Sequence, residues 1–284
     1  MQTTGLFVIH KITVDVKEIN KPIYLIPFGD IHRSSQMCHV EKWKEFLLWA
    51  KKKERALFLG MGDYDDLTSA SERNILINRG LHDTTTKTIN DLYRTHTEKL
   101  AKELIFMHGK LIGLMEGNHY GEFSNGTTTT QALADKLETK YLGCSAFIRL
   151  AFRYGKKRAS VDVWAHHGKG AARLMGGSIN RVQQMGESAE ADIFLMGHDH
   201  KKAVGMMDKL HLSEGNSGLK LRHKKQLYIR TGSFLKGYEN NTVSYVADMA
   251  LNPTNLGVVK IEITPRRVEN KNGDSYYLDL HASI

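Results

Sequence analysis

The sequence predicts an α/β fold, because short apolar segments of strand length alternate with amphipathic segments of helix length over the first 200 residues. A polar cluster follows each of the main apolar segments, as in folds whose reactive groups gather at strand ends. Of the 284 residues, 41% are hydrophobic and 25% are charged, which is the balance of a globular chain with a hydrophobic core. We expect one domain spanning residues 1–284.

Five apolar segments are predicted to be β-strands. They are residues 23–28, 56–59, 111–115, 161–165 and 193–196. Each is followed at its carboxyl end by a cluster of glycine with acidic, amide or imidazole side chains. In α/β sheets such groups meet at one rim, so we expect these five clusters to lie close together.

Helices are expected between the strands. Apolar residues at spacings of three and four predict an amphipathic helix around Val40, Trp43, Leu47 and Ala50. Residues 84–107 carry a similar stripe, formed by Ile89, Leu92, His96, Leu100 and Leu104. Residues 131–140 and 179–188 are further predicted helices.

The character of the chain changes after residue 200. Apolar segments at 226–230, 243–247, 257–263 and 276–280 have no helix between them, which predicts a second, more antiparallel sheet. Residues 201–225 carry seven Lys and Arg against only Asp208 and Glu214. We expect this segment to be a mobile basic loop beside the last polar cluster.

The bulk composition narrows the functional classes. Neither a signal peptide nor a membrane span is indicated, so a cytoplasmic protein without membrane partners is expected. Cys38 and Cys144 are far apart and outside any CxxC motif, which indicates ordinary thiols. The formal net charge of +9 suits a phosphorylated or polyanionic partner, and it equally suits a well-solvated surface.

The five polar clusters have the composition of a metal site. In chain order they are Asp30-Ile31-His32, Gly62-Asp63-Tyr64-Asp65-Asp66, Gly117-Asn118-His119, His166-His167-Gly168 and Gly197-His198-Asp199-His200. Carboxylate oxygen and neutral imidazole nitrogen suit Mn, Fe, Ni or Zn better than calcium. An extended backbone would aim side chains i and i+2 at one ion, and the glycines at 29, 62, 117 and 197 would let the chain turn sharply.

In order and content, these clusters resemble the DxH, GDxxD, GNH, strand-end His and GHxH motifs of the calcineurin-like metallophosphoesterase superfamily, over residues 30–200. The resemblance implies a four-layer α/β/β/α sandwich of two mixed sheets flanked by helices. It also implies an enzyme that hydrolyses phosphate esters with a metal-activated water and two divalent ions, with Mn favoured over Fe, Zn or Ni.

The resemblance also implies a ligand set. One ion would be held by Asp30, His32, Asp63 and His200. The other would be held by Asp63, Asn118, His198 and the strand-end His, with Asp63 bridging the pair. Either His166 or His167 could be that last ligand, and the run that begins His167-Gly168-Lys169-Gly170 resembles phage-type members and favours His167.

Further residues are assigned supporting roles by the same resemblance. His119 would protonate the leaving oxygen or stabilise the phosphoryl group, unless it is a structural histidine behind the ligands. Asp66 would orient ligands or cap a helix. Tyr120 stands where many members carry an acid, with Glu122 two residues on, and residues 232–234 resemble a tail motif that closes the site.

Substrate contacts are less specific. Lys169 and Arg173 follow the strand-end His and could bind a phosphate, or they could be solvated surface. Hydrolysis of a phosphodiester, with DNA or RNA as the leading substrate class, is the first functional hypothesis. The alternatives are a phosphomonoesterase acting on a small molecule or phosphoprotein, and a metal-binding protein without catalysis.

Overall fold

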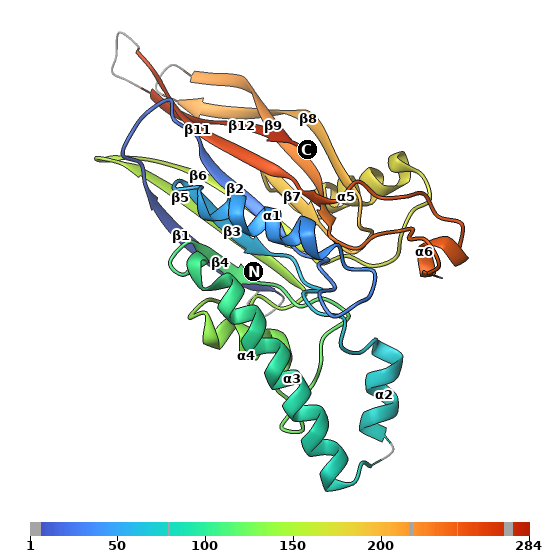
Figure 1. Cartoon of the computed structure of the whole chain (residues 1–284). Coiled ribbons are helices and arrows are strands. Elements are labelled where there is room, and N and C mark those ends of the chain that lie inside the picture. Colours follow the sequence, from blue (N-terminus) through green and yellow to red (C-terminus); the bar gives the residue numbers. More distant parts are fainter. Residues whose placement is uncertain (1–6, 79, 216–217, 243, 270–274) are drawn as a thin grey trace.

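The computed structural model of the chain describes residues 7–78, 80–215, 218–242, 244–269 and 275–284. Within these ranges the fold is mixed α/β, with two mixed β-sheets and six α-helices (Figure 1). No helix in this part of the chain is long and apolar enough to cross a membrane.

The smaller sheet has five strands in the order β12-β11-β2-β3-β4. Strands β2 (Ile23–Phe28), β3 (Ala56–Gly60) and β4 (Leu111–Leu114) are parallel to one another. Strand β11 (Lys260–Val268) runs antiparallel to β2, and β12 (Ser275–Ser283) forms the edge beside it. The carboxyl ends of β2, β3 and β4 therefore share one rim.

The larger sheet has seven strands, of which six follow the order β1-β5-β6-β7-β9-β10 while β8 pairs with β9. They are β1 (Val8–Asp15), β5 (Ser145–Tyr154), β6 (Lys157–His166), β7 (Ile193–Met196), β8 (Lys202–Gly215), β9 (Gly218–Ser233) and β10 (Gly257–Val258). Strands β6, β7 and β9 are parallel, so their carboxyl ends also share a rim.

Hydrophobic cores lie between the sheets and on both of their outer faces. The two sheets bury Leu25, Leu59, Ile148 and Leu195 against each other, in one continuous cluster. Helices α1 (Val40–Lys51), α3 (Asp83–Leu104) and α4 (Thr129–Lys136) cover the five-stranded sheet, while α5 (Met175–Ser188) covers the seven-stranded one. The remaining helical segments are α2 (Ala70–Asn78), η1 (Ile105–Met107) and α6 (Tyr245–Asp248).

Most of the predicted elements are confirmed, with shifted boundaries. The helix expected at 131–140 begins earlier, because Thr128 and Gln131 form a capping box, and it ends at Lys136, two residues before Glu138 turns to a φ of 49°. In α3 the predicted Leu100 and Leu104 are buried, but the stripe before them is displaced by one residue. Leu92 is 50% exposed, and the buried face is formed by Tyr93, Thr97, Leu100 and Leu104.

The prediction of a mobile loop at residues 201–225 is wrong. Strands β8 and β9 form one long hairpin that is paired from Lys202↔Thr231 to Gly215↔Gly218. Exposed leucines lie on one face, including the facing pair Leu212 and Leu221, while Arg222 projects from the other, so the segment has the period of two that strands require. In the sequence, the many Lys and Arg residues made this strand-like alternation hard to recognise.

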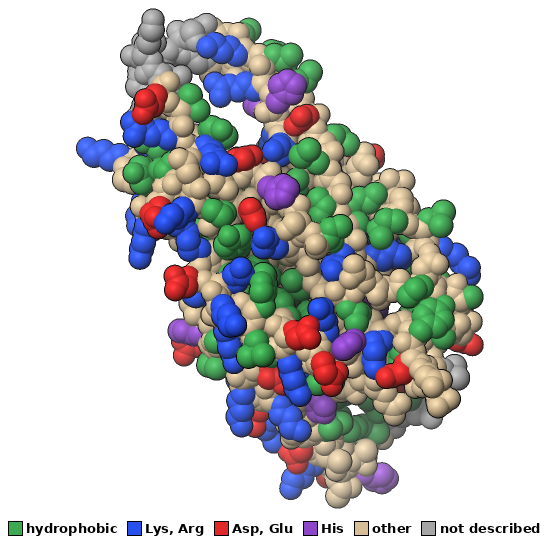
Figure 2. Space-filling view, turned by 45° about the horizontal axis from the view of Figure 1, so that its top comes forward, with side chains coloured by type: hydrophobic (Ala, Val, Ile, Leu, Met, Phe, Trp, Pro, Cys, Tyr) green, Lys and Arg blue, Asp and Glu red, His purple; other side chains and the backbone are tan. Residues whose placement is uncertain are grey.

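Figure 2 shows Lys and Arg side chains spread among acidic and apolar ones rather than in one patch on the face that it displays.

Two other expectations about the C-terminal part are also wrong. The later strands do not form a sheet of their own, because β9 extends the larger sheet beside β7 and β11 extends the smaller one beside β2. The strand expected at 243–247 is replaced by helix α6, and residue 243 lies outside the described residues. Strands β1 and β5 and helix α2 were not anticipated. Cys38 is buried and Cys144 exposed, both as free thiols, as expected.

Candidate metal centre

The structure brings all seven predicted ligands to the rim where the carboxyl ends of the two sheets meet. Strands β2, β3 and β4 supply Asp30, His32, Asp63 and Asn118 from the loops that follow them. The larger sheet supplies His167 directly after β6, and His198 and His200 after β7. Each sheet therefore provides part of the cluster.

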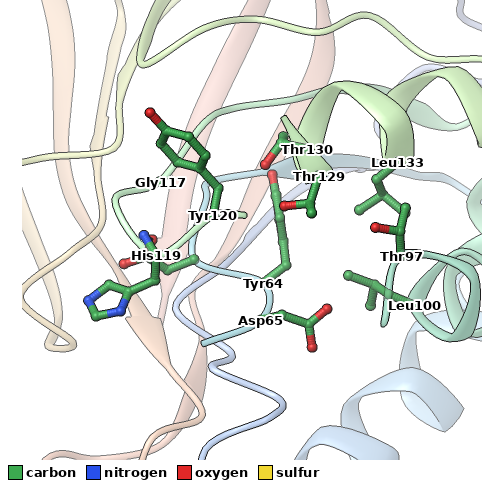
Figure 3. Close-up of a pocket in the computed structure, with 11 residues that line it drawn as sticks. Tyr64, Asp65, Thr97, Leu100, Gly117, His119, Tyr120, Thr129, Thr130 and Leu133 are labelled. Atoms are coloured by element: carbon green, nitrogen blue, oxygen red, sulfur yellow. The ribbon is translucent and has the colours of Figure 1, made fainter. Parts of the chain in front are cut away.

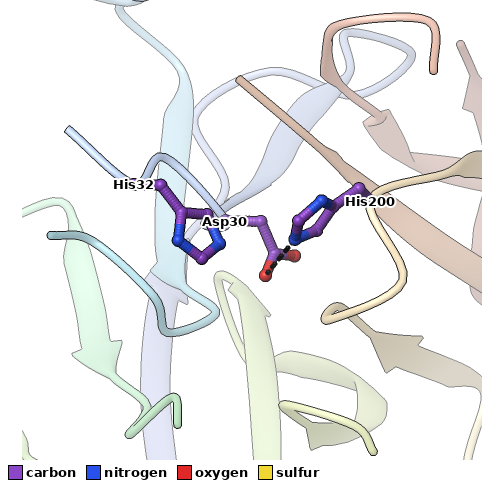
Figure 4. A group of neighbouring side chains, drawn as sticks. All are labelled: Asp30, His32 and His200. Atoms are coloured by element: carbon purple, nitrogen blue, oxygen red, sulfur yellow. Dashed lines mark ion pairs between the residues drawn. The ribbon is translucent and has the colours of Figure 1, made fainter. Parts of the chain in front are cut away.

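The first group of ligand atoms belongs to Asp30, His32 and His200, which face one another in Figure 4. Their candidate ligand atoms all lie within 4.8 Å of one another. The Asp30 Oδ1 atom is 3.9 Å from His200 Nε2, and the Asp30 side chain is fully buried. This distance is too long for a direct hydrogen bond, and it leaves room for an ion between the atoms.

The second group belongs to Asp63, His167 and His198, again within 4.8 Å of one another. His167 Nε2 is 3.3 Å from Asp63 Oδ2 and 3.0 Å from Asn118 Oδ1. His198 Nδ1 is 2.8 Å from the same Asn118 oxygen. Asp63 Oδ2 also lies 3.8 Å from His32 Nε2 of the first group, so one carboxylate faces both groups.

Several of these atoms have no protein partner. Asp30 Oδ1 and both ring nitrogens of His32 are buried without a hydrogen bond to any described residue. An unsatisfied buried polar atom costs about 1–3 kcal/mol, so a native structure needs something to occupy the space between them. Carboxylate oxygens and imidazole nitrogens that face one another without a donor fit a divalent transition-metal ion.

His167 is the member of the adjacent pair that enters the cluster. Its Nδ1 donates to the Met61 carbonyl at 2.8 Å, which leaves Nε2 to face Asp63 and Asn118. The other histidine, His166, uses Nδ1 to accept from the Gly168 amide at 2.7 Å in its own loop. A fixed Nδ1–H with a free Nε2 is the usual state of a metal-binding imidazole.

The electrostatics of the cluster favour added positive charge. Burial of the His167 ring opposes its ionisation, but the attraction of Asp63 raises its pKa to about 9. Burial acts to raise the pKa of Asp63, yet His167 and His32 hold it well below its usual range. Burial raises the pKa of Asp30. Protons and divalent cations therefore compete for the same cluster of acceptors.

The backbone is left-handed at the ligands themselves. Five of the nine non-glycine residues with positive φ in the described chain are predicted ligands, namely Asp30, His32, Asp63, His198 and His200, with φ between 46° and 72°. Such conformations are strained and concentrate at functional sites. The expectation of an extended backbone at residues 30–32 and 198–200 is therefore wrong, although the side chains still converge.

The glycines mainly allow close approach instead of turning the chain. Of the four that were singled out, only Gly62 has a positive φ, at 98°. A Cβ at Gly117 would collide with Asp63 Oδ1, and a Cβ at Gly197 would lie 2.9 Å from Asp30 Oδ2. Each loop thus packs directly against a ligand of another loop.

Asp66 links a ligand to the predicted proton donor. Its Oδ1 is 2.6 Å from His119 Nδ1 and 3.7 Å from His32 Nδ1. The hydrogen bond to Asp66 raises the pKa of His119. The hydrogen bond from His119 and the nearby His32 ring hold the pKa of Asp66 below its usual range. Asp66 does not cap a helix, because α2 begins only at Ala70 and Ser69 accepts from the amide of Glu72.

The space behind the GNH loop is too small for a substrate. The cavity lined by Tyr64, Thr97 and Leu133 has a volume of about 20 Å³, room for about one water molecule. Figure 3 shows the His119 ring turned away from it. Any substrate must therefore approach from the other side of this histidine.

Other predicted residues are placed around the rim. Lys169 and Arg173 are exposed in the loop that follows His167, and no described contact fixes their side chains. In the predicted tail motif, Ser233 Oγ and the Phe234 amide donate to the Asp30 carbonyl at 2.8 and 3.0 Å. This motif therefore fixes the backbone of Asp30, one of the predicted ligands.

Sequence reasoning missed two supporting arginines. Arg73 stacks on Tyr120 at 3.7 Å, and its Nη1 donates to the carbonyls of Asn118 and Tyr120 at 3.0 and 2.8 Å. The fully buried Arg230 donates to the Gly197 carbonyl at 2.9 Å and lies 3.4 Å from Asp199. Both bind backbone carbonyls, for which a sequence carries no pattern.

Comparison of the chain with protein-family models and with curated proteins found no match. The geometry of the rim and the chemistry of its side chains therefore indicate what the chain could do.

Proposed function

We propose that the chain is a dinuclear metal-dependent phosphoesterase. The observation that carries this proposal is the pair of ligand groups, Asp30/His32/His200 and Asp63/His167/His198, with Asp63 facing both. Bound there, two divalent ions would supply Lewis acidity toward phosphoryl oxygens and lower the pKa of a water. Mn, Fe, Zn and Ni all accept such oxygen and nitrogen donors, and Mn is the metal that the resemblance to the calcineurin-like superfamily favours.

His119 is the proposed proton donor to the leaving oxygen. Asp66 accepts from its Nδ1, which fixes the ring and leaves Nε2 free for a substrate. The same hydrogen bond raises the pKa of His119, so a larger fraction of the ring carries the second proton near neutral pH. Lys169 and Arg173 are the proposed contacts for the remaining phosphate oxygens.

The order of layers supports the resemblance to calcineurin-like metallophosphoesterases. Helices α1, α3 and α4 pack outside the smaller sheet and α5 packs outside the larger one, with a core between the sheets. We propose a four-layer α/β/β/α sandwich on this basis. The ligands come from the loops at which that family carries its motifs.

A phosphodiester is the proposed substrate class, and nucleic acid is the version that the net charge favours. Only the start of the basic segment lies beside the proposed metal centre, because Lys220 and Arg222 lie near the far end of the hairpin, beside Ser213 and His211. The nuclease version therefore depends on Lys169 and Arg173. A phosphomonoesterase is the alternative that the same metal centre would serve.

The decisive experiment combines metal analysis with an ester panel for the wild type and Asp63→Asn. The panel contains a fluorogenic diester, a fluorogenic monoester, and labelled single- and double-stranded DNA, each assayed with Mn. We expect two ions per wild-type chain and ester turnover. Asp63→Asn should lower turnover by at least about 1,000-fold, because the shared carboxylate is lost from both groups.

The outcomes separate the versions of the proposal. Turnover of the monoester alone would favour the phosphomonoesterase. Two tightly bound ions without turnover of any ester would make the chain a metal-binding protein without catalysis. A wild type that binds no divalent ion would overturn the metal centre itself.

A further inference from the structure

A largely buried ion network lies beside the two turns that supply His32 and Asp63. Arg33 follows His32, and its Nε and Nη2 donate to the two oxygens of Asp65 at 3.0 and 3.3 Å. Its Nη1 donates to Glu103 Oε1 at 2.8 Å. The side chains of Arg33 and Asp65 are 12% and 7% exposed, so the pair is largely removed from water.

The network fastens both turns to the helices that cover the smaller sheet. Glu103 belongs to α3, and its second oxygen accepts from Trp43 Nε1 of α1 at 2.8 Å. Arg33 Nη2 also donates to the His96 carbonyl of α3 at 2.8 Å. One guanidinium therefore joins two loops and one helix directly, and a second helix through Glu103.

The turns need such fastening because their backbone is strained. Asp30, His32 and Asp63 have φ of 46°, 48° and 50°. The Ile31 amide donates to the Asp63 carbonyl at 2.8 Å, so the two turns are directly linked. A left-handed non-glycine residue costs roughly 1–3 kcal/mol and persists only where its surroundings over-determine it.

We propose that Arg33 is a positioning residue for the ion assigned to Asp30, His32, Asp63 and His200. It acts through Asp65 and Glu103, and in the described chain its guanidinium forms no hydrogen bond or ion pair with a predicted ligand. The second ion depends less on it, because Asn118, His167 and His198 lie on other loops. This inference rests on the proposed metal centre.

Coulomb's law alone makes the opposite prediction. Removing a positive side chain beside a cation site should strengthen metal binding, because the repulsion between Arg33 and the ion disappears. A positioning role predicts weaker binding, because the ligand atoms no longer converge. The two predictions therefore differ in sign. Outer partners of metal ligands typically contribute 10–100-fold in metal affinity or activity, so the expected weakening is large enough to measure.

The test compares Arg33→Met and Arg33→Lys with the wild type by Mn titration, bound metal after dialysis, and ester turnover at increasing Mn. We expect Arg33→Met to keep about one ion where the wild type keeps two, with the weaker site losing affinity by about 10–100-fold. Saturating Mn should restore most of kcat without changing KM for the ester. Arg33→Lys, which keeps the charge but loses the fork, should fall in between.

Arg153→Met is the matched control. Arg153 makes a two-pronged ion pair with Asp15 at 2.6 and 3.0 Å between β5 and β1, at the edge of the larger sheet, and its loss should leave both ions bound. If Arg33→Met binds Mn as tightly as the wild type or more tightly, the positioning role is wrong while the metal centre stands. If the wild type binds no Mn, the metal centre itself fails. Should Arg33→Met unfold in circular dichroism, Arg33→Lys decides, because weaker Mn binding supports the positioning role and unchanged binding contradicts it.

Discussion

At the scale of single residues, two adjacent histidines at the end of β6 have different environments. The Nδ1 of His167 is held by the Met61 carbonyl, and its Nε2 faces Asp63 and Asn118. The neighbouring His166 faces another direction, as successive residues along a strand do, and accepts from the Gly168 amide. The same substitution at these two adjacent positions should therefore have different effects.

We expect His167→Gln to lose one of the two ions and to lower ester turnover by at least about 100-fold, because the ring supplies a donor that the amide cannot replace in the same place. His166→Gln should keep both ions and lower turnover by no more than a few-fold. Metal analysis after dialysis and ester kinetics check both variants. Loss of an ion in His166→Gln alone would reverse the assignment.

The chemical identity of the candidate site could be predicted from the sequence, but its geometry could not. The Asp, His and Asn residues stand in a fixed order at strand ends, and the structure brings them together. The left-handed φ of Asp30 or Asp63 has no signature, because non-glycine residues adopt it only under tertiary constraint. Arg33 was missed because its partners Asp65 and Glu103 are 32 and 70 residues away.

At the scale of secondary-structure elements, the β8–β9 hairpin carries most of the basic segment away from the candidate metal centre. Strand β8 begins at Lys202, two residues after His200, and runs away from the rim. At roughly 3.3 Å per residue, the Ser213–Lys220 pair lies about 35 Å along the strand from that start. Nearer the rim, Lys209 and Lys224 are paired with Glu190.

We therefore expect the double variant Lys220→Glu/Arg222→Glu to hydrolyse a small fluorogenic diester within about twofold of the wild-type rate, because screening at 0.15 M salt acts over about 8 Å. The control makes the same charge change next to His167, with Lys169→Glu/Arg173→Glu, which should lower turnover more strongly. A tenfold loss in the hairpin variant would show that the hairpin reaches the site.

The elements that could be predicted are those with a clear apolar pattern. Strand β7 is a continuous buried run from Ile193, and α1 carries Trp43 and Leu47 on its buried face. Strand β1 alternates between half-buried and exposed residues, but its His and Lys obscured the pattern. Which sheet each late strand joins was not predictable, because neither β9 nor β11 has an apolar pattern that specifies its partner strand.

At the scale of the whole molecule, the candidate metal centre joins the two sheets. Asp30, His32 and Asp63 follow strands of the smaller sheet, whereas His198 and His200 follow β7 of the larger one. Asp30 also accepts from the His198 amide at 2.8 Å across this junction. Ions bound at the rim would therefore connect the sheets at one end, in addition to the hydrophobic core between them.

Metal removal should accordingly destabilise the whole fold. An ion present at 100 times its Kd stabilises the folded state by about 2.7 kcal/mol, because the unfolded chain does not preserve the site. For a chain of this size, that corresponds to a Tm lower by roughly 5–10 °C after chelation. Thermal melts with Mn and with excess EDTA measure the difference.

Asp63→Asn provides the control for this measurement, because a chain that has lost the carboxylate facing both groups should show little difference between Mn and EDTA. Calcium should restore the wild-type Tm poorly, since imidazole nitrogen is a weak ligand for it. An equal EDTA effect in both proteins would place the stabilising ion elsewhere. No effect in the wild type would mean that the buried carboxylates are neutralised without metal, and that the junction of the sheets depends on the hydrophobic core alone.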